Sequence, residues 1–402
     1  MRYVTPSATK QCLRDTLDVI PLTGRLSGSV SALAETDVKS ICDHATNKYH
    51  PDRTSWERAH IIDNSAHILL TIPLPLRVMG FLYSQLFKRL PYPTGSFAGK
   101  TIIITGSNVG LGKEAARHYV RLGASRMILA VRSLDKGQAA KQDIEASTSC
   151  ADDVIQVWQI DMGSYDSVKQ FASRVNTELD RVDIFIANAG IARFRYSTIG
   201  DNEAQITVNV VSTFLLAALV MPKLKETAAK YRTRPTLTIT TSEVHGHTKF
   251  PQRLAPDGQI FATINDKATA EKYKMEMYPI SKLLEIYGVR YIAEKHPAST
   301  FPVTVNCVNP GLCHSELSRD ADSFMFNMVK FLLARSTEVG SRNLFHAGAM
   351  GADSHGQYVS DCKIGEPASV VTSKEGKKAQ DRVIAELVKK LDAIQPGVWN
   401  NI

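Results

Sequence analysis

A glycine-rich turn between an expected strand and an expected helix constrains the fold of this chain more than any other feature. The apolar run of residues 101–105 leads directly into the turn, and a helical pattern over residues 113–122 follows it. Glycine lets the backbone turn tightly and approach a pyrophosphate, whose charge is favoured by the free N–H groups and dipole of a helix N-terminus. The segment therefore predicts a dinucleotide-binding unit, with cofactor contacts from Gly106, Ser107, Gly110, Leu111 and Gly112.

Short apolar runs alternate with longer helical patterns after Gly99, which is typical of repeated βαβ units around a parallel sheet. Helices are expected to begin near Gly110, Asp135, Tyr165 and Glu203. The pattern predicts an α/β fold, a doubly wound and Rossmann-like parallel sheet that binds ligands at the carboxyl ends of its strands. The expected strands are residues 101–105, 126–131, 154–160, 182–187, 236–241 and 303–308.

The N-terminal part of the chain has a different character. Residues 1–65 are polar and show no clean period, which predicts a poorly structured extension of unknown role. An apolar or amphipathic segment and linker follow over residues 66–96, and the catalytic and cofactor-binding domain is expected over residues 97–402. Residues 77–90 predict a short amphipathic helix. This helix either lies on a membrane surface, giving peripheral contact through residues 68–90, or packs against the catalytic domain.

Charge and cysteine content argue against several classes of protein. The formal charge of +8 comes from 48 Lys and Arg residues scattered among 40 acidic ones, so no dense basic block indicates a nucleic-acid partner. The six cysteines include no CxxC pair, which favours a reducing intracellular compartment, taken as the cytoplasm, over a disulfide framework or a zinc site. Charged residues between Lys10 and Asp18 interrupt any signal-peptide core, so secretion is not expected.

The end of the second expected strand selects between the two nicotinamide dinucleotides. A carboxylate there would accept a hydrogen bond from a free ribose 2′-hydroxyl and would repel a 2′-phosphate. This sequence instead has Arg132, with Lys136 close behind, and no acid over residues 130–133. The pattern predicts NADP(H) as the cofactor, and the alternative is a solvated arginine at a strand end.

Tyr278 and Lys282 form a YxxxK motif on an expected helix. The four-residue spacing puts the phenol and the ammonium on one face, where both can reach one ligand. A free tyrosine has a pKa of about 10, and a neighbouring lysine charge brings that pKa towards the working pH, so Tyr278 is expected to exchange a proton. Ser242, at the end of the fifth expected strand, is expected to hydrogen-bond the substrate oxygen.

Together these elements resemble the short-chain dehydrogenase/reductase family. The turn reads TGxxxGxG after the first expected strand, residues 188–190 read Asn-Ala-Gly after the fourth, and residues 309–311 read Asn-Pro-Gly after the sixth. The resemblance covers about residues 97–402. It implies an oxidoreductase that moves hydride between a nicotinamide cofactor and a carbonyl or alcohol, with Lys282 also contacting the nicotinamide ribose.

The same resemblance implies roles for six further residues. Asp161 would lie beside the adenine, and Asn188 belongs to a small-residue element close to the two riboses. Asn209 would be the fourth member of the catalytic set and would hold a water that links Lys282 to solvent. Ser315 stands roughly where the family usually has a threonine. The turn beside the nicotinamide carboxamide would be made by Pro310 and Gly311.

The expected substrate is a small molecule, a bulky and mostly apolar carbonyl compound that is reduced rather than formed. Its pocket would be shaped by residues 244–277 and by the apolar stretch that contains Phe326 and Phe331, which is equally open to core packing or a homodimer contact. The Arg132 pattern and the long interval between Ser242 and Tyr278 look most like the retinol-dehydrogenase-like and fungal biosynthetic branches of the family. Segments such as NPGLCHSEL resemble fungal members associated with secondary-metabolite pathways. This likeness implies a tailoring step in fungal secondary metabolism.

Other interpretations remain open. His245, His247 and His314 lack carboxylate or cysteine partners at metal-ligand spacing, so they are expected to flank the pocket and no metal site is predicted. Cys313 is either a thiol near the nicotinamide or a small packing residue. The alternative functions are a membrane-associated retinoid- or lipid-type dehydrogenase and an NADP(H)-binding sensor without turnover.

Overall fold

A computed structural model describes residues 76–314 and 333–402 of the chain. The chain divides after Lys88 into two compact units, the first of which also takes in Leu333. In the first unit the described residues form α4 (Leu76–Phe87), a helix without acidic residues in which the rings of Tyr83 and Phe87 lie 6.0 Å apart. The expected helix is therefore present, and its contact with a membrane stays a prediction.

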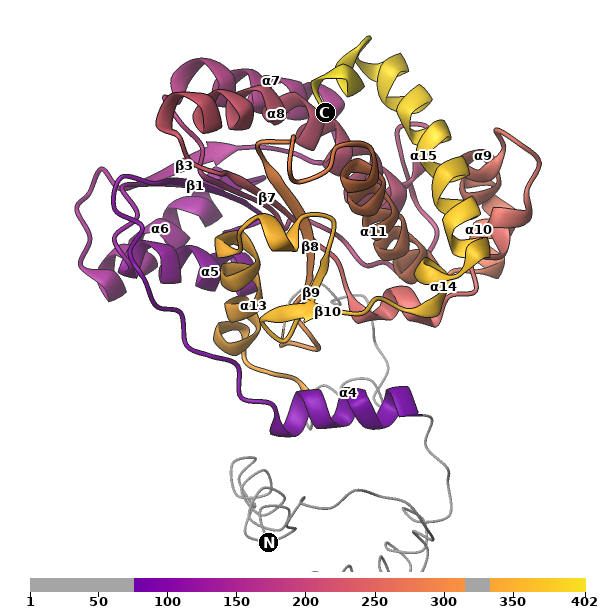
Figure 1. Cartoon of the computed structure of the whole chain (residues 1–402), viewed down its shortest axis with the longest axis horizontal. Coiled ribbons are helices and arrows are strands. Elements are labelled where there is room, and N and C mark those ends of the chain that lie inside the picture. The colour runs from indigo at the N-terminus through magenta and orange to yellow at the C-terminus, as the bar shows by residue number, and fades with distance from the viewer. Residues whose placement is uncertain (1–75, 315–332) are drawn as a thin grey trace, which may run out of the picture. The chain divides into compact units, whose positions relative to one another are not determined.

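The second unit is built on one eight-stranded sheet (Figure 1). The strand order is β10-β9-β8-β7-β4-β1-β2-β3, and all neighbours are parallel except the antiparallel pair β9 and β10. The chain thus starts in the middle of the sheet and builds outward in both directions, as a doubly wound fold does. The strands are β1 (Thr101–Thr105), β2 (Arg126–Val131), β3 (Ile155–Gln159), β4 (Ile184–Ala187), β7 (Thr236–Thr240), β8 (Thr304–Asn309), β9 (Tyr358–Ser360) and β10 (Lys363–Gly365), with a separate pair β5 (Thr198–Ile199) and β6 (Asn202–Glu203).

Helices cover both faces of this sheet (Figure 1). On one face α5, α6 and α13 pack against the strands, and on the other lie α7, α8 and α11, with α15 packed against α11. The helices are α5 (Gly110–Arg121), α6 (Leu134–Thr148), α7 (Tyr165–Glu178), the π-helix η1 (Ile206–Val211), α8 (Ser212–Tyr231), α9 (Ile260–Asn265), α10 (Lys267–Lys272), α11 (Met277–Lys295), α13 (Thr337–Ala349), α14 (Ser369–Thr372) and α15 (Lys374–Ile394). Short 3₁₀ turns are η2 (Glu243–His247), η3 (Pro251–Leu254), η5 (Ala352–Ser354) and η6 (Val398–Asn401).

The central strands read as nearly continuous apolar runs because both of their faces are covered. Every residue of β1 and β4 is buried, as is every residue of β2 after Arg126. Within the described residues, one helix is long and apolar enough to cross a membrane, the continuous stretch Ile206–Tyr231. Of its apolar 18-residue part, 89% is buried inside the protein. Its apolarity is accounted for by packing between the sheet, α7 and η6.

All six expected strands are present, with ends displaced by two residues at most. The fold class is confirmed. The pair β9 and β10 was not expected, since strands of three residues carry too few positions to show an alternating pattern. The long C-terminal helix α15 buries Val383, Ile384, Leu387 and Leu391 on one side.

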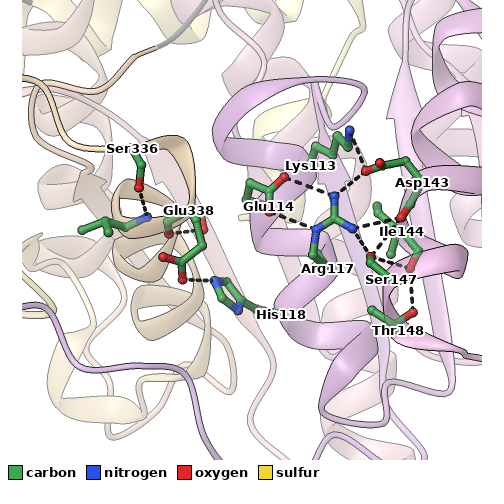
Figure 2. A network of polar contacts seen from close by, with 12 residues as sticks. Lys113, Glu114, Arg117, His118, Asp143, Ile144, Ser147, Thr148, Ser336 and Glu338 are labelled. Atoms are coloured by element: carbon green, nitrogen blue, oxygen red, sulfur yellow. Dashed lines mark hydrogen bonds and ion pairs between the residues drawn. The ribbon is translucent and has the colours of Figure 1, made fainter. Parts of the chain in front are cut away.

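Polar contacts tie the helix that follows the glycine turn to its neighbours (Figure 2). Lys113 Nζ of α5 lies 2.8 Å from Asp143 Oδ2 of α6, and Arg117 pairs with the same carboxylate. On the α13 side, His118 Nε2 lies 3.2 Å from Glu338 Oε1. These contacts hold α5 in place between α6 and α13.

The residues that lead into β1 run along α5 and α13. Arg121 donates a hydrogen bond to Pro93 O at 2.7 Å, and Arg342 donates one to Leu90 O at 2.8 Å. The Tyr92 ring lies against both guanidinium groups, 4.6 Å from Arg121 and 5.0 Å from Arg342. Cation–π contacts and hydrogen bonds from the two guanidinium groups to main-chain carbonyls thus fasten this segment to α5 and α13.

Candidate active site

The glycine turn starts at the carboxyl end of β1 and leads into α5. Gly106 and Gly110 have φ angles of +67° and +61°, a region that side chains rarely adopt. A Cβ on Gly106 would lie 3.0 Å from Ala189 Cα, and one on Gly112 would lie 2.7 Å from Asn188 Nδ2. Glycine is required at these positions by conformation or by space, and the resulting cradle fits a pyrophosphate.

Thr105 joins this turn to the segment after β4. Its Oγ1 accepts hydrogen bonds from the backbone N–H groups of Asn188 at 3.0 Å and Ala189 at 2.9 Å. In return, Asn188 Nδ2 donates to Thr105 O at 2.9 Å and to Gly106 O at 3.3 Å. The Ser107 hydroxyl is also turned inward, where it donates to Ile104 O at 2.8 Å, so this hydroxyl is engaged by the protein.

The first turn of α5 has no side-chain cap. Val109, at the N-cap position, makes no capping hydrogen bond, whereas Ser133, Ser164 and Ser336 cap α6, α7 and α13. The first N–H groups of a helix have no partners within the helix and carry the positive end of its dipole. α5 leaves these donors, in the turn that contains Leu111, for an anion in the glycine cradle.

Arg132 and Lys136 lie where the second strand ends. Gly106 N donates to Ala130 O at 2.8 Å, which places the glycine turn beside the end of β2. Both basic side chains are exposed, and no carboxylate in the described ranges pairs with either of them. They are therefore available to a phosphate at this edge of the sheet.

Asp161 follows β3 at the same edge. Its Oδ1 accepts a hydrogen bond from Gly163 N at 2.9 Å, and its own backbone N–H donates to Ser167 Oγ at 2.9 Å. The carboxylate is thus held by a local turn. Its predicted contact with the adenine stays a prediction.

Tyr278 lies in the first turn of α11, and Ser242 caps η2 directly after β7. Burial raises the pKa of Tyr278 above its ordinary value, the Lys282 charge lowers it, the Glu285 charge raises it, and a side-chain hydrogen bond with Ser242 lowers it. The predicted pair of hydroxyls therefore meets at one point. A carbonyl oxygen at this point can accept hydrogen bonds from both of them.

Lys282 lies one turn after Tyr278, with Nζ 5.6 Å from the centroid of the tyrosine ring. Its Nζ donates to Thr240 O at 2.8 Å and lies 2.8 Å from Glu285 Oε1. A Cβ on Gly190 would lie 3.7 Å from the same Nζ. The ammonium thus lies on the same helix face as the tyrosine, as the YxxxK spacing predicts, and close to the segment that follows β4.

Asn209 lies in the π-helix η1 and is completely buried. Its amide spans two elements, because Oδ1 accepts from Ile191 N at 2.9 Å while Nδ2 donates to Ile191 O at 2.9 Å and to Ser281 Oγ at 3.0 Å. Ser281 Oγ in turn donates to Tyr278 O at 2.8 Å. Asn209 therefore braces the start of α11, and its proposed hold on a water stays a prediction.

The turn after β8 is organised by Asn309. Its Oδ1 accepts from Gly311 N and from Glu243 N, both at 3.1 Å, which links this turn to the residues after β7. Gly311 has a φ of +79°. Pro310 O accepts from Asn343 Nδ2 of α13 at 3.2 Å. Pro310 and Gly311 are thus fixed at the edge of the sheet where the other predicted cofactor residues lie.

Cys313 is a packing residue rather than a reactive thiol. A Cβ on Gly340 would lie 2.2 Å from its Sγ, and burial raises the pKa of the thiol to about 12. Ser315 and the apolar stretch with Phe326 and Phe331 fall outside the described residues.

His245 also has a structural role. Its Nδ1 lies 2.7 Å from Ser242 O, and Ala368 N donates to its Nε2 at 2.8 Å, so the ring bridges the residue after β7 and the segment before α14. Over residues 76–314 and 333–402, no three His, Cys, Asp or Glu side chains gather as metal ligands would.

A shallow depression in the surface includes Met277, which precedes Tyr278, and Gln205, which precedes η1. The remaining lining residues are Arg193, Arg195, Tyr196, Glu203, Ala270 and Lys274.

Three residues of this site were not expected from the sequence. Glu285 pairs with Lys282, Thr105 joins the two cofactor segments, and Thr240 supplies the carbonyl that holds Lys282. Of these, only Glu285 could have been found from the sequence, because an acid three residues after a lysine lies on the same helix face. The other two act through a hydroxyl and a main-chain oxygen of ordinary strand threonines.

The chain was compared with known proteins. Residues 100–255 match the family described as short chain dehydrogenase. A short chain dehydrogenase/reductase of Cryptosporiopsis sp. (strain 8999), dmxR8, is 74% identical over 323 residues, which cover 80% of this chain and 100% of that relative. The short-chain dehydrogenase anuD of Penicillium roqueforti (strain FM164) is 40% identical over 332 residues, which cover 80% and 85% of the two chains.

Solved structures are more distant in sequence. The Escherichia coli oxidoreductase yciK is 21% identical, with a TM-score of 0.49 over 67% of this chain and 98% of that one.

Proposed function

Because this chain belongs to the short-chain dehydrogenase/reductase family, we propose that it uses NADP(H) to interconvert a carbonyl and an alcohol on a lipophilic small molecule. One observation carries the proposal: Ser242, Tyr278 and Lys282 meet near the glycine cradle at the carboxyl edge of the sheet. A protein that only bound the cofactor would not need these three groups together. Reduction is the favoured direction, since most of the cellular NADP pool is kept in the reduced form, NADPH.

Each of the three side chains has its own part in reduction. The bound cofactor supplies the hydride that the carbonyl carbon receives. Tyr278 donates its phenolic proton to the carbonyl oxygen, which becomes the alcohol hydroxyl, and a phenolate remains on the tyrosine. Ser242 donates a hydrogen bond to the same oxygen while negative charge develops there, and the Lys282 ammonium stabilises the phenolate. In oxidation the phenolate takes the proton from the alcohol.

The glycine cradle, the uncapped start of α5 and the anchored Asn188 are suited to hold a dinucleotide. The preference for NADP(H) rests on Arg132 and Lys136, two exposed cations at the edge where the adenosine ribose is expected. Arginine binds phosphate through two parallel hydrogen bonds, whereas an acid at this place would repel it.

Cofactor preference is tested by replacing Arg132. We expect Arg132→Ala to lower kcat/KM for NADPH by about 30-fold, the equivalent of one charged hydrogen bond of ~2 kcal/mol, with little change for NADH. Arg132→Asp should reverse the preference. Arg126→Ala is the matched control, because Arg126 lies at the opposite end of the same strand. Equal use of both cofactors by the wild type would assign Arg132 to the solvated surface.

The substrate proposal is a tailoring step on a bulky, mostly apolar carbonyl compound in fungal secondary metabolism. Its support is the fungal origin of the similar relatives. The test follows NADPH oxidation over a panel that pairs small ketones with large polycyclic ones. Saturable NADPH binding without turnover on any member would favour a sensor over an enzyme, and equal efficiency on small and large ketones would remove the size preference.

An intracellular location, with peripheral membrane contact through residues 68–90, is also proposed. The support is α4, a helix without acidic residues in which the Tyr83 side chain is 59% exposed. Fractionation of the full chain beside a chain that lacks residues 1–88 tests it, since only the full chain should sediment with membranes.

A further inference from the structure

A carboxylate lies directly behind the catalytic lysine. Glu285 is 2% exposed and Lys282 is 4% exposed, so the pair is almost completely withdrawn from water. Lys282 Nζ and Glu285 Oε1 are 2.8 Å apart. Burying two charges is costly, and a pair of this kind stabilises a fold less than apolar side chains of the same size often do. Its presence next to the reacting groups therefore calls for a role in the reaction.

The geometry fixes the direction of the ammonium. Of its three N–H donors, one is used by Thr240 O and one by Glu285, both at 2.8 Å. The described residues supply no third acceptor, and the ammonium lies 5.6 Å from the centroid of the Tyr278 ring. Glu285 and Thr240 thus leave one donor for the ligand side, where the tyrosine and the cofactor ribose are expected.

The surroundings of Glu285 contain few other charges. The Thr241 hydroxyl, at the end of β7, donates to Lys282 O at 2.9 Å and lies close enough to lower the pKa of the carboxyl. From β8 comes the buried Cys307 thiol, whose pKa is raised by burial and by the Glu285 charge. The turn η2, which packs against α11, carries His245, whose ring is engaged by Ser242 O and Ala368 N. Lys282 is therefore the charged group that lowers the pKa of the Glu285 carboxyl.

The two members of the pair act on Tyr278 with opposite signs. The positive Lys282 favours the phenolate and lowers the pKa of Tyr278, whereas the negative Glu285 raises it. Burial raises the pKa of Glu285 to about 7, with Lys282 acting in the other direction. The charge on this carboxyl group therefore changes within the pH range in which the protein would work.

We propose that Glu285 is a positioning residue that holds the Lys282 ammonium towards the ligand and offsets part of its charge, so that the state of this carboxyl controls how readily Tyr278 releases its proton. The inference rests on the proposed oxidoreductase function and deepens it. It assigns to one buried carboxylate the pH dependence of the proton transfer.

The test compares Glu285→Gln with the wild type in alcohol oxidation, which needs the Tyr278 phenolate. Glutamine keeps the shape and removes the negative charge, so the uncompensated lysine should lower the pKa of Tyr278. We expect the acid limb of the kcat/KM profile to move to lower pH by about one unit, while Kd for NADP⁺ changes by less than about threefold. Glu285→Asp keeps the charge but shortens the reach, so it should lower kcat and leave the limb in place.

Glu294→Gln is the matched control. Glu294 lies on the same helix α11 and pairs with Lys377 at 2.7 Å near the surface, so this variant should keep both the rate and the profile of the wild type. An unmoved acid limb in Glu285→Gln would overturn the proposal, as would a rate loss that is equal at every pH. If Glu285→Gln does not fold, Glu285→Asp provides the test. Because this variant keeps the negative charge, an acid limb that moves in it would overturn the proposal.

A second readout does not depend on turnover. In full-length protein with ¹³C-labelled tyrosine, the Tyr278 resonance is assigned by its loss in Tyr278→Phe, and its titration is followed without a substrate. A lower titration midpoint in Glu285→Gln supports the inference, and an unchanged midpoint overturns it. If the wild type turned over no carbonyl compound but this midpoint moved, the proposed function would fail while the coupling of Glu285 to Tyr278 would stand.

Discussion

The Tyr278 hydroxyl carries the one proton that the proposed reaction transfers. Tyr278→Phe removes this proton and almost none of the contact area with a ligand. We expect kcat to fall at least ~1000-fold and Kd for NADPH to change less than ~threefold. Steady-state rates measure the first quantity, and titration of NADPH fluorescence measures the second.

Tyr291→Phe is the control for this variant. Tyr291 lies on α11 as well, with Lys295 Nζ 5.6 Å from its ring, and it takes no part in the site. It should keep the rates of the wild type. If Tyr278→Phe retained more than about a tenth of the wild-type turnover, Tyr278 would not be the proton donor.

The residues that a motif joins could be predicted, and those joined only by tertiary packing could not. Tyr278 and Lys282 are four residues apart on one helix, so the sequence alone places them together. Glu285 lies on the same face, yet an acid near a lysine is usually a solvated surface pair. In the fold it is buried and interacts with Thr241, directly after β7, and with Cys307 of β8.

At the scale of elements, the contact between α8 and α11 depends on one missing side chain. Gly288 of α11 lies against the Phe214 ring of α8, and a Cβ at this glycine would come within 2.0 Å of a ring carbon. Both residues are buried in the same core. The ring must move if any side chain is added here, because the interior is closely packed.

Gly288→Ala is therefore expected to lower the free energy of unfolding by about 1–3 kcal/mol. Urea denaturation followed by circular dichroism measures the change. Gly351→Ala is the control, since a Cβ at Gly351 meets nothing within 4 Å and its φ of −84° suits any residue. Equal stability of the two variants would show that the helices separate without strain.

The elements themselves were predicted to different degrees. Long periodic segments such as α5 and α7 and apolar runs such as β1 and β2 carry enough positions to show their period. The π-helix η1 was expected only as the start of an ordinary helix. Its extra residue per turn has no pattern in the sequence, although π-turns are frequent at functional sites.

For the whole molecule, the buried Glu285 links stability to pH. Its pKa is about 7 in the folded protein and 4.5 for a free side chain, so the folded state binds more protons between these values. Stability therefore falls as pH rises through this window, and the contribution is fully present only below the unfolded value.

We expect the free energy of unfolding of the wild type, measured against Glu285→Gln at each pH, to fall between pH 5 and pH 8 by an amount on the order of 1–3 kcal/mol. Urea unfolding at one-unit intervals measures both proteins. A difference that is constant with pH would mean that Glu285 keeps an ordinary pKa in the fold.

The overall architecture followed from the order of strands and helices, since parallel neighbours require crossovers that restrict the possible sheets. Contacts between side chains and backbone groups far apart in the sequence could not be predicted in this way. Glu386 of α15, for example, accepts hydrogen bonds from Ile260 N and Phe261 N at the start of α9, across more than 120 residues of chain. A carboxylate on a helix gives no sign in the sequence of which distant backbone it will cap.

The hydrogen bonds that join Thr105 to Asn188 and Ala189 have a thermodynamic consequence. They hold the two loops of the dinucleotide cradle together through protein groups alone. The conformational entropy of these loops is consequently lost when the chain folds and not when a ligand arrives. Association with the cofactor would then be governed by displaced solvent and new polar contacts, with little loop ordering to oppose it.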